Sequence, residues 1–249
     1  MQEKLNYDEF AGMFGGFWAE RFRPFIESKE MYDIYRRLKT DSQKEKIVPK
    51  SDDVFRAFAC TDPNRIRSIW YMMDPYPKRY RNKAYQATGI AMDCKNSPDG
   101  KLQPSLEKFY EGMEKDLGKL VDRSPDLEYL LEQGIMLTNT DLTCKLNKTG
   151  SHRKVWEPFQ KFFLEEIMGG YSGIIYVLAG KESHRMEKYI MPVGNYIFKI
   201  DHPVTASYSN TDWNCDHIFT KINKLLKENH NEKIYWDRRD WEEDNEPPF

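Results

Sequence analysis

The sequence predicts an α/β protein with a mostly parallel sheet whose two faces are covered by helices. Two observations lead to this prediction. Four short apolar runs, each shorter than an average helix, occur at wide intervals along the 249 residues, at 66–73, 134–137, 173–178 and 196–200. The sequence between consecutive runs looks helical, and strands that alternate with helices in this way pair in parallel.

The helices are expected from the spacing of apolar side chains. Residues 1–45 should form a mostly helical N-terminal extension, because aromatic residues recur there at a helical period, at Phe14, Phe17, Trp18, Phe22 and Phe25. Three later segments have the same period, namely 106–117, 155–168 and 216–229. With no internal repeat and no long linker, residues 1–249 are expected to form a single domain.

The last residues, 237–249, are rich in acidic side chains. Between Asp240 and Glu246 there are five acidic residues and no basic one, so we expect a solvated, flexible tail. The alternative is a docking peptide for a protein partner, which would use Trp241 or Phe249.

The composition excludes several classes of protein. Apolar residues make up 39% of the chain and charged residues 31%, with a net charge of -2, so any nucleic-acid binding must depend on a local basic patch. No apolar run is long enough to predict a membrane span, and the first residues do not resemble a signal peptide. The four cysteines are scattered, which predicts neither a zinc site nor disulfides and favours a reducing cytoplasm.

Polar residues follow each of the four predicted strands. They are Asp74 after the first strand, Thr138 and Asn139 after the second, Gly180 and Lys181 after the third, and Asp201 and His202 after the fourth. Each has an ordinary structural explanation, as a turn or a helix cap. Ligands of open parallel sheets bind at the carboxyl ends of the strands, however, so the four together predict an enzyme site at that edge.

Several longer motifs resemble a known family. The segments "DPYP" (74–77), "PSLEKFYEGMEKDL" (104–117), "QGIMLTNTDLTC" (133–144), "SHRKVWEPFQKFF" (151–163) and "HPVTAS" (202–207) occur in the order of the motifs of family-1 uracil-DNA glycosylases. "CDHIFTKINKLL" (215–226) and "KIYW" (233–236) resemble the last helix and closing segment of that family. The match covers roughly residues 50–236. "DPYP" and "CKLNKTGSH" (144–152) resemble the poxvirus branch most, which favours a viral or phage source.

This resemblance implies both a fold and a reaction. The fold would be a three-layer α/β/α sandwich around a short four-stranded sheet. The reaction would be hydrolysis of the N-glycosidic bond of deoxyuridine in single- or double-stranded DNA, which leaves an abasic site for base excision repair. It requires no metal and no organic cofactor. The expected location is the cytoplasm of a bacterium or an infected host cell, or the nucleus of a eukaryotic host.

The resemblance also assigns roles to residues at the strand ends. Asp74 would stabilise the positively charged sugar and orient the attacking water, and His202 would donate to the uracil O2 as negative charge develops there. Asn139 would read the uracil edge, with help from the Met73 N–H. Tyr76, held between Pro75 and Pro77, would exclude the thymine methyl group.

Other residues would hold the DNA or depart from the family pattern. The phosphates would be bound by Ser105, Gly180, Lys181 and Ser207, with Lys78, Arg79, His152 and Arg153 as outer cations. Met92 stands where the family stacks an aromatic ring on uracil. Ala206 stands where a leucine fills the gap left by the extruded base. We therefore expect weaker base flipping, or a preference for single strands and A·U-rich duplex, unless Tyr208 or Trp213 substitutes for the leucine.

These departures leave two further readings. One is a weakened or inactive glycosylase-fold protein that serves as a DNA-binding or replication-accessory factor. The other is a glycosylase with a different modified base as its substrate. A replication or repair protein would bind through the N-terminal extension or the acidic tail.

Overall fold

Four strands form the central sheet of the computed structural model, which describes residues 5–245. They are β2 (Ser68–Met72), β3 (Ile135–Asn139), β5 (Ile175–Ala179) and β6 (Tyr196–Ile200). Their order is β3-β2-β5-β6, and all neighbours are parallel. The four predicted strands are confirmed, with bounds that differ by up to two residues. Thr138 and Asn139 are the last residues of β3 rather than residues beyond it.

Burial explains why these segments form strands. Every residue of β2, β3 and β5 is buried, as expected for parallel strands covered on both faces. β6 lies at the edge of the sheet and has exposed Lys199 near its end. The sheet is therefore the core of the molecule, and its ends are the places where polar side chains reach solvent.

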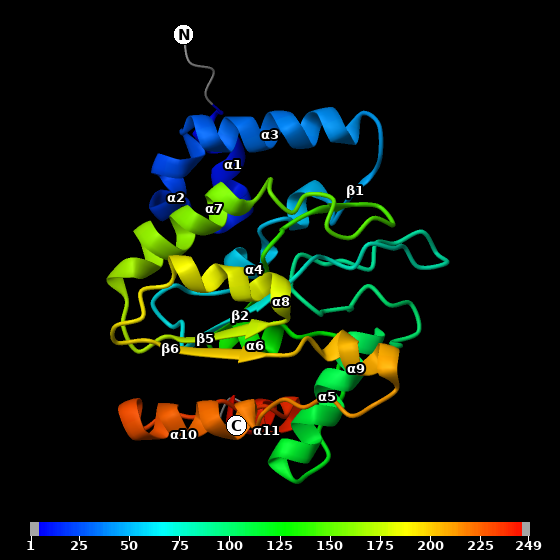
Figure 1. Cartoon of the computed structure of the whole chain (residues 1–249), viewed down its shortest axis with the longest axis vertical. Coiled ribbons are helices and arrows are strands. Elements are labelled where there is room, and N and C mark those ends of the chain that lie inside the picture. The colour runs from blue at the N-terminus through cyan, green and yellow to red at the C-terminus, as the bar shows by residue number, and fades with distance from the viewer. Residues whose placement is uncertain (1–4, 246–249) are drawn as a thin grey trace.

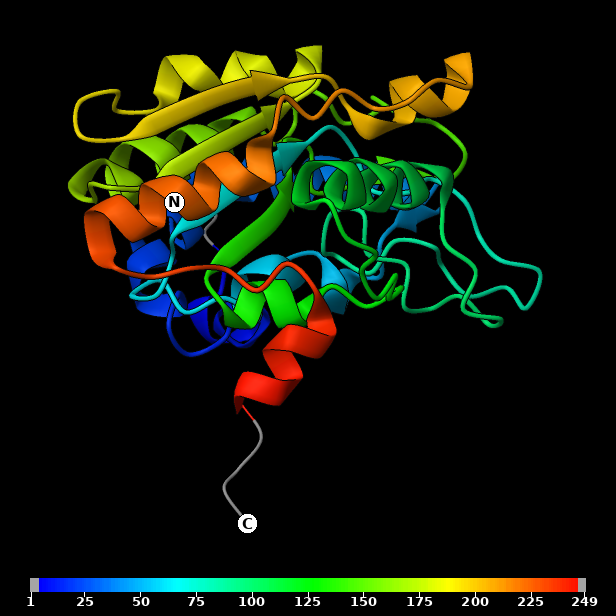
Figure 2. The same ribbon diagram turned by 90° about the horizontal axis from the view of Figure 1, so that it is seen from below.

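Helices cover both faces of the sheet, which makes three layers and confirms the expected sandwich (Figure 1). The N-terminal helices and α7 lie on one side, and α10 runs along the other, as the view from below shows (Figure 2). The helices are α1 (Tyr7–Phe14), α2 (Ala19–Ile26), α3 (Lys29–Ser42), α4 (Arg56–Ala59), α5 (Pro104–Leu117), α6 (Glu128–Glu132), α7 (Glu157–Phe162), α8 (Lys181–His184), α9 (Pro203–Ser209), α10 (Ile218–His230) and α11 (Arg238–Asn245). Within residues 5–245, none of them is both long and apolar enough to cross a membrane.

The predicted helices are largely confirmed. The segment 106–117 lies in α5, and all but the first two residues of the segment 216–229 lie in α10. The segment 155–168 begins as α7 but continues as a wider π turn, Phe163–Ile167, and a 3-10 turn, Met168–Gly170. Apolar spacing does not distinguish these variants, because all of them keep one side facing the core.

The N-terminal helices are part of the core rather than an appendage. Trp18 and Phe22 have no exposed surface, and both pack against Phe58 and Phe163 with ring centroids 5.1 to 6.0 Å apart within the cluster. The Trp18 indole N–H donates to the Thr61 carbonyl. Phe17 is the exception to the aromatic pattern, since it is 55% exposed.

The expectation of a flexible acidic tail is wrong for residues 238–245, which form α11. Trp241 is partly buried and its ring centroid lies 6.2 Å from that of Tyr235. Asp240 accepts from Lys119 Nζ at 2.6 Å. The acidic composition did not predict this helix, because the contacts of Trp241 with Tyr235 and of Asp240 with Lys119 involve residues outside it. Phe249 lies outside the described residues.

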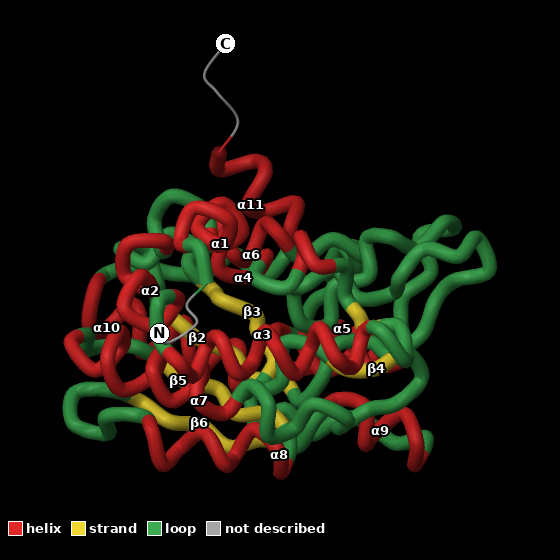
Figure 3. Tube along the Cα trace, turned by 90° about the horizontal axis from the view of Figure 1, so that it is seen from above, coloured by secondary structure: helices red, strands yellow, loops and turns green. Residues whose placement is uncertain are grey.

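A second, two-stranded sheet was not predicted. β1 (Ile47–Val48) pairs antiparallel with β4 (Cys144–Lys145), and two-residue strands have no recognisable period. Short 3-10 turns at Ser51–Asp53 and Arg185–Tyr189 complete the regular structure of the described residues. Long loops gather at the end of the molecule that carries α5, β4 and α9 (Figure 3).

Candidate active site

A cleft of about 500 Å³ lies at the carboxyl edge of the sheet. The strand order places the reversal of the chain between β2 and β5, which is where open α/β sheets bind ligands. Residues at the end of each strand, or directly after it, line the cleft. Ten of the predicted site residues line it: Met73, Asp74, Tyr76, Pro77, Met92, Ser105, Asn139, Gly180, Lys181 and His202.

Asp74 is held rigidly at the exit of β2. Its Oδ2 accepts a hydrogen bond from the Gly150 N–H, and Pro75 fixes the backbone that follows. Its Oδ1 is buried and has no fixed donor among the described residues. Burial raises the pKa of Asp74, and the Gly150 N–H opposes this by stabilising the anion.

His202 combines a structural and a chemical function. It is the N-cap of α9, and its Nδ1 accepts from the Val204 N–H at 3.1 Å. Because Nδ1 accepts, the proton of the neutral ring is on Nε2, which is therefore a donor. Burial lowers the pKa of His202 to about 4, so the imidazole is neutral at physiological pH.

Asn139 presents an unsatisfied amide to the cleft. Its Oδ1 is buried without a hydrogen-bond partner among the described residues. Its backbone carbonyl accepts from Gln160 Nε2 at 3.0 Å, and the Gln160 Oε1 accepts from the Tyr71 hydroxyl at 2.9 Å. The end of β3 is therefore fixed while the amide oxygen stays available. A buried acceptor left without a donor is a feature expected where a ligand supplies the donor.

Tyr76, Met92 and Ser105 form one connected wall. The Tyr76 hydroxyl donates to the Met92 carbonyl at 3.1 Å and lies 2.7 Å from the Ser105 hydroxyl. Met92 has a φ of +64°, a left-handed conformation that is uncommon for a residue with a side chain. Ser105 is only 3% exposed, so its hydroxyl holds Tyr76 in place in this structure.

His152 does not fit its expected place among the outer cations. It is fully buried, and its Nδ1 lies 2.8 Å from the Thr143 hydroxyl. Burial lowers the pKa of His152, which disfavours its charged form. The expectation that His152 is an outer cation is therefore corrected. Asp41 of α3 lies 3.6 Å from its Nε2, and a contact between segments so far apart in the chain cannot be read from the local sequence.

The remaining DNA-facing candidates lie outside the cleft lining. Lys78 is exposed, the Arg79 guanidinium lies 4.1 Å from the centroid of the Tyr85 ring, and Arg153 Nε lies 3.1 Å from Glu182 Oε2. The Ser207 hydroxyl donates to the Pro104 carbonyl at 3.0 Å. None of these four residues lines the cleft.

The structure separates the three candidates for filling the space of an extruded base. Ala206 is 4% exposed, and Trp213 is also 4% exposed, with its indole N–H donating to the Asp201 carbonyl. Tyr208 is 84% exposed and lines the cleft from α9. Of the three, only Tyr208 has a side chain that projects from the surface.

Sequence reasoning missed three residues that support the site. Gln160 fixes the end of β3, Asp141 lies buried with Arg185 Nη2 donating to its Oδ1 at 2.9 Å, and Glu182 lines the cleft. The charged residue in the motif "TNTDLTC" was the available signal for Asp141, because a carboxylate inside an apolar run needs a partner. Within residues 5–245, no group of three or more His, Cys, Asp or Glu side chains is placed to hold a metal ion.

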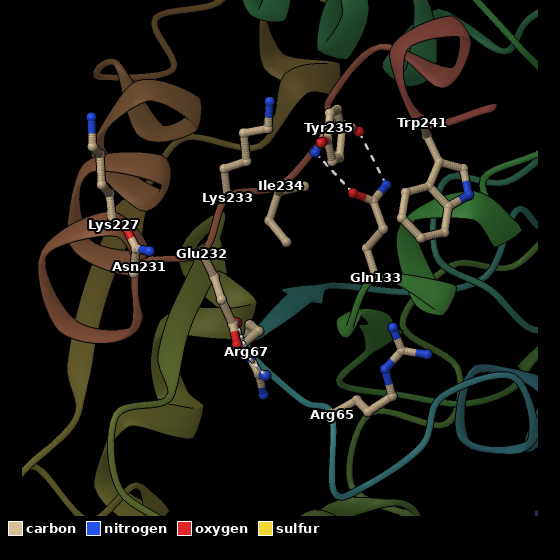
Figure 4. A pocket seen from close by; sticks show the side chains of 10 residues that line it. All are labelled: Arg65, Arg67, Gln133, Lys227, Asn231, Glu232, Lys233, Ile234, Tyr235 and Trp241. Atoms are coloured by element: carbon tan, nitrogen blue, oxygen red, sulfur yellow. Dashed lines mark hydrogen bonds and ion pairs between the residues drawn. The ribbon is translucent and has the colours of Figure 1, made fainter. Parts of the chain in front are cut away.

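A second hollow, of about 540 Å³, lies at the opposite edge of the sheet, where Arg65 and Arg67 precede β2 (Figure 4). Gln133 bridges to the backbone of Tyr235 there, donating to its carbonyl at 3.1 Å and accepting from its N–H at 2.8 Å. Arg67 pairs with Glu232. Gln133, Arg67 and Glu232 therefore already have partners, unlike the unpartnered oxygens of the first cleft.

The first cleft therefore has the features of a hydrolase that acts on the bond between a sugar and a planar base. Its lining combines a carboxylate, a neutral imidazole donor and an amide oxygen without a partner among the described residues, which are groups suited to that reaction.

Comparison with known proteins supports this class. A uracil-DNA glycosylase of Aliivibrio salmonicida is 31% identical over 220 residues, which cover 88% of this chain and 93% of that protein. A uracil-DNA glycosylase of Fusobacterium nucleatum is 27% identical over 220 residues, with 88% and 94% covered. No model of a protein family matches the chain.

Solved structures show the same fold. The mimivirus uracil-DNA glycosylase superposes with a TM-score of 0.82 at 23% identity, over 94% of this chain and 90% of that one. The enzyme from Nitratifractor salsuginis gives 0.58 at 19% identity, over 88% and 92%. The chain belongs to the uracil-DNA glycosylase family. It is a DNA glycosylase that hydrolyses the N-glycosidic bond of deoxyuridine in DNA.

Proposed function

We propose that Asp74, His202 and Asn139 carry out this hydrolysis on one uracil nucleotide extruded from DNA into the cleft. The observation that carries the proposal is the convergence of these three side chains, from three different strand ends, on a single cleft. Each offers an atom suited to its role: a carboxylate, a neutral Nε2 donor and a free amide oxygen.

The charges of the reaction match the two sides of the cleft. The bond between C1′ and N1 breaks with its electron pair going to uracil, while a water oxygen bonds to C1′ and the proton that this water loses balances the negative charge of the departing uracil. Asp74 stabilises the positive sugar and orients this water. His202 donates to the uracil O2 as negative charge develops there, and one preorganised donor of this kind contributes about 3–4 kcal/mol in the transition state.

Base selection would come from Asn139 and Tyr76. The free Asn139 Oδ1 accepts from the uracil N3–H. Tyr76 is held at Met92 and Ser105, and its ring would stand where the thymine methyl must go. Met92 supplies a polarisable surface for the face of the base, and the Met73 N–H supplies a further backbone contact, although it has no side-chain specificity.

Binding of the DNA would use the rim of the cleft. Ser105, Gly180, Lys181 and Ser207 would bind the phosphates, with Lys78, Arg79 and Arg153 as outer cations. Tyr208 would take the role of the missing leucine at Ala206, because its exposed ring can occupy the space that the extruded base leaves. Affinity should fall steeply with salt.

Two finer assignments belong to this proposal. Pro77 and the segment 144–152 support placement near the poxvirus branch of family 1, and hence a viral or phage source working in the cytoplasm of its host. A replication or repair partner of the N-terminal helices would have to bind their outer surface, where Phe17 is 55% exposed, because the inner surface is packed.

The test uses labelled single- and double-stranded oligonucleotides that contain one uracil, followed by alkali. Strand scission by the wild type that is lost in Asp74→Asn and His202→Leu is the expected result. Tight DNA binding without scission would instead indicate a replication-accessory protein. Scission only with another modified base would replace uracil as the substrate.

A further inference from the structure

Asp141 brings a second carboxyl group to Asp74. The chain continues to pair after the two strands end, since the Thr140 N–H donates to the Met72 carbonyl at 2.9 Å and the Asp141 N–H to the Met73 carbonyl at 3.1 Å. This pairing sets the Asp141 side chain beside the Asp74 side chain. Asp141 has no exposed surface, and a buried carboxyl group is stable only when it is neutral or paired.

The contacts of the two groups leave one oxygen on each without a fixed donor. Arg185 Nη2 donates to Asp141 Oδ1, and the Gly150 N–H donates to Asp74 Oδ2. Asp141 Oδ2 and Asp74 Oδ1 are buried and otherwise unpartnered. The two side chains are close enough for each to change the pKa of the other. Carboxylates have no donor, so a hydrogen bond between these two oxygens requires one shared proton.

The surroundings indicate which residue keeps the proton. Burial and the Asp74 charge raise the pKa of Asp141 to about 7, while Arg185 opposes this. The hydrogen bond from Asp141 lowers the pKa of Asp74. Arg153 also favours the Asp74 anion, and Glu182 disfavours it. Two buried carboxyl groups that share a site hold one proton between them over a wide pH range.

We propose that Asp141 is a positioning residue that keeps this proton and donates it, as a hydrogen bond, to the Asp74 carboxylate. Asp74 then remains ionised and is oriented by two donors, Gly150 on one oxygen and Asp141 on the other. Arg185 fixes the far oxygen of Asp141 and so sets its direction. This inference rests on the proposed role of Asp74 in the reaction.

A consequence is an alkaline limit to turnover. When Asp141 loses its proton, Asp74 loses a donor and gains a negative neighbour, which disturbs its orientation. Asp141→Asn is the matched variant, because its amide can accept from Arg185 and donate to Asp74 but cannot ionise. Asp141→Val removes the donor altogether.

The experiment measures kcat and KM for uracil excision under single-turnover and steady-state conditions from pH 5 to 9. We expect the wild type to lose turnover above neutral pH, and Asp141→Asn to keep its turnover there. Asp141→Val should lower kcat by about 10-fold with KM little changed, the size expected for one hydrogen bond to a charged group. Asp93→Asn is the control: Asp93 is also buried, and burial raises its pKa to about 7, but its two oxygens accept from the backbone N–H groups of Lys95 and Leu127.

The outcomes separate this inference from the proposed function. A wild type without uracil excision would contradict the function itself. A wild type that excises uracil, with both Asp141 variants folded by urea unfolding and unchanged in kcat and pH profile, would overturn the role of Asp141. An inactive but folded Asp141→Asn would also overturn it, because the proton itself would then have to move. A change in the pH profile with Asp93→Asn equal to that with Asp141→Asn would overturn the assignment to this pair.

Discussion

The Gly180 backbone packs closely against the side chain of His202 at the carboxyl edge of the sheet. A side chain on Gly180 would place its Cβ 3.0 Å from the His202 Cβ, and the Gly180 backbone has a φ of +91°. The Gly180 N–H also donates to the Ile200 carbonyl at 2.8 Å. The position of the imidazole in the cleft therefore depends on glycine in the neighbouring strand exit.

Gly180→Ala should lower activity more than it lowers stability. The added methyl group strains the positive φ by about 1–2 kcal/mol and pushes His202 away from the cleft. We expect kcat for uracil excision to fall by at least about 10-fold, since small displacements of catalytic groups have large effects. Gly100→Ala is a suitable control, because Gly100 also has a positive φ but no atom within 4 Å of the added carbon. Equal losses of kcat in both variants would contradict the contact with His202.

His202→Asn should distinguish the function of His202 as the N-cap of α9 from its proposed function as a donor to uracil. Asparagine is a good N-cap and can accept from the Val204 N–H, so α9 should stay folded. The donor to the base is lost, and kcat should fall by about 10²–10³-fold. Single-turnover excision and urea unfolding measure the two effects. A variant with wild-type kcat would remove His202 from the mechanism.

The free energy of unfolding should depend on pH through the imidazole of His202. The pKa of His202 is lowered from 6.5 to about 4, so between these values the unfolded chain takes up a proton that the folded chain does not. The stability contributed by neutral His202 is complete above about pH 6.5 and is lost as the pH falls towards 4. The free energy of unfolding of the wild type should therefore decrease on acidification relative to His202→Asn. A constant difference between the two proteins would show that His202 titrates normally.

Tyr208→Ala should affect duplex DNA selectively. If the exposed ring fills the space of the extruded base, its loss removes about 1–3 kcal/mol of stacking, so excision from a duplex should slow by about 10-fold or more. Excision from a single strand, which has no stack to fill, should change little. Ser209→Ala, at a neighbouring exposed residue, is the control. Equal effects on both DNA forms would contradict the role of Tyr208 in flipping.

Tyr76→Ala should relax the exclusion of thymine. Removing the ring opens space for the methyl group, and a difference of one methyl is worth about 10–200-fold in discrimination. Thymine excision should become measurable on oligonucleotides with a single G·T mismatch, while uracil excision slows. Tyr76→Phe keeps the ring and loses only the hydroxyl that contacts Met92 and Ser105, so it should still reject thymine. Thymine excision by Tyr76→Phe alone would place the selectivity elsewhere.

Much of the fold could be predicted because its signals are local. The strands are continuous apolar runs, since burial on both faces requires it, and α5 and α10 have a plain helical period. The convergence of Asp74, Asn139 and His202 also followed from sequence, because the carboxyl ends of parallel strands share one edge. The helix α11 was missed because two of its contacts lie outside the helix: Trp241 packs against Tyr235, and Asp240 pairs with Lys119.

The sequence by itself determined the sheet, its covering helices and the set of polar side chains at one edge, since these depend on periodicity and on residue order along the strands. The tertiary structure decided which of those groups are available to a ligand. It buried His152, exposed Tyr208, aligned His202 through Val204 and placed Asp141 against Asp74 with Arg185 behind it. Burial and the identity of a partner depend on segments far apart in the chain, so they are fixed only when the chain has folded.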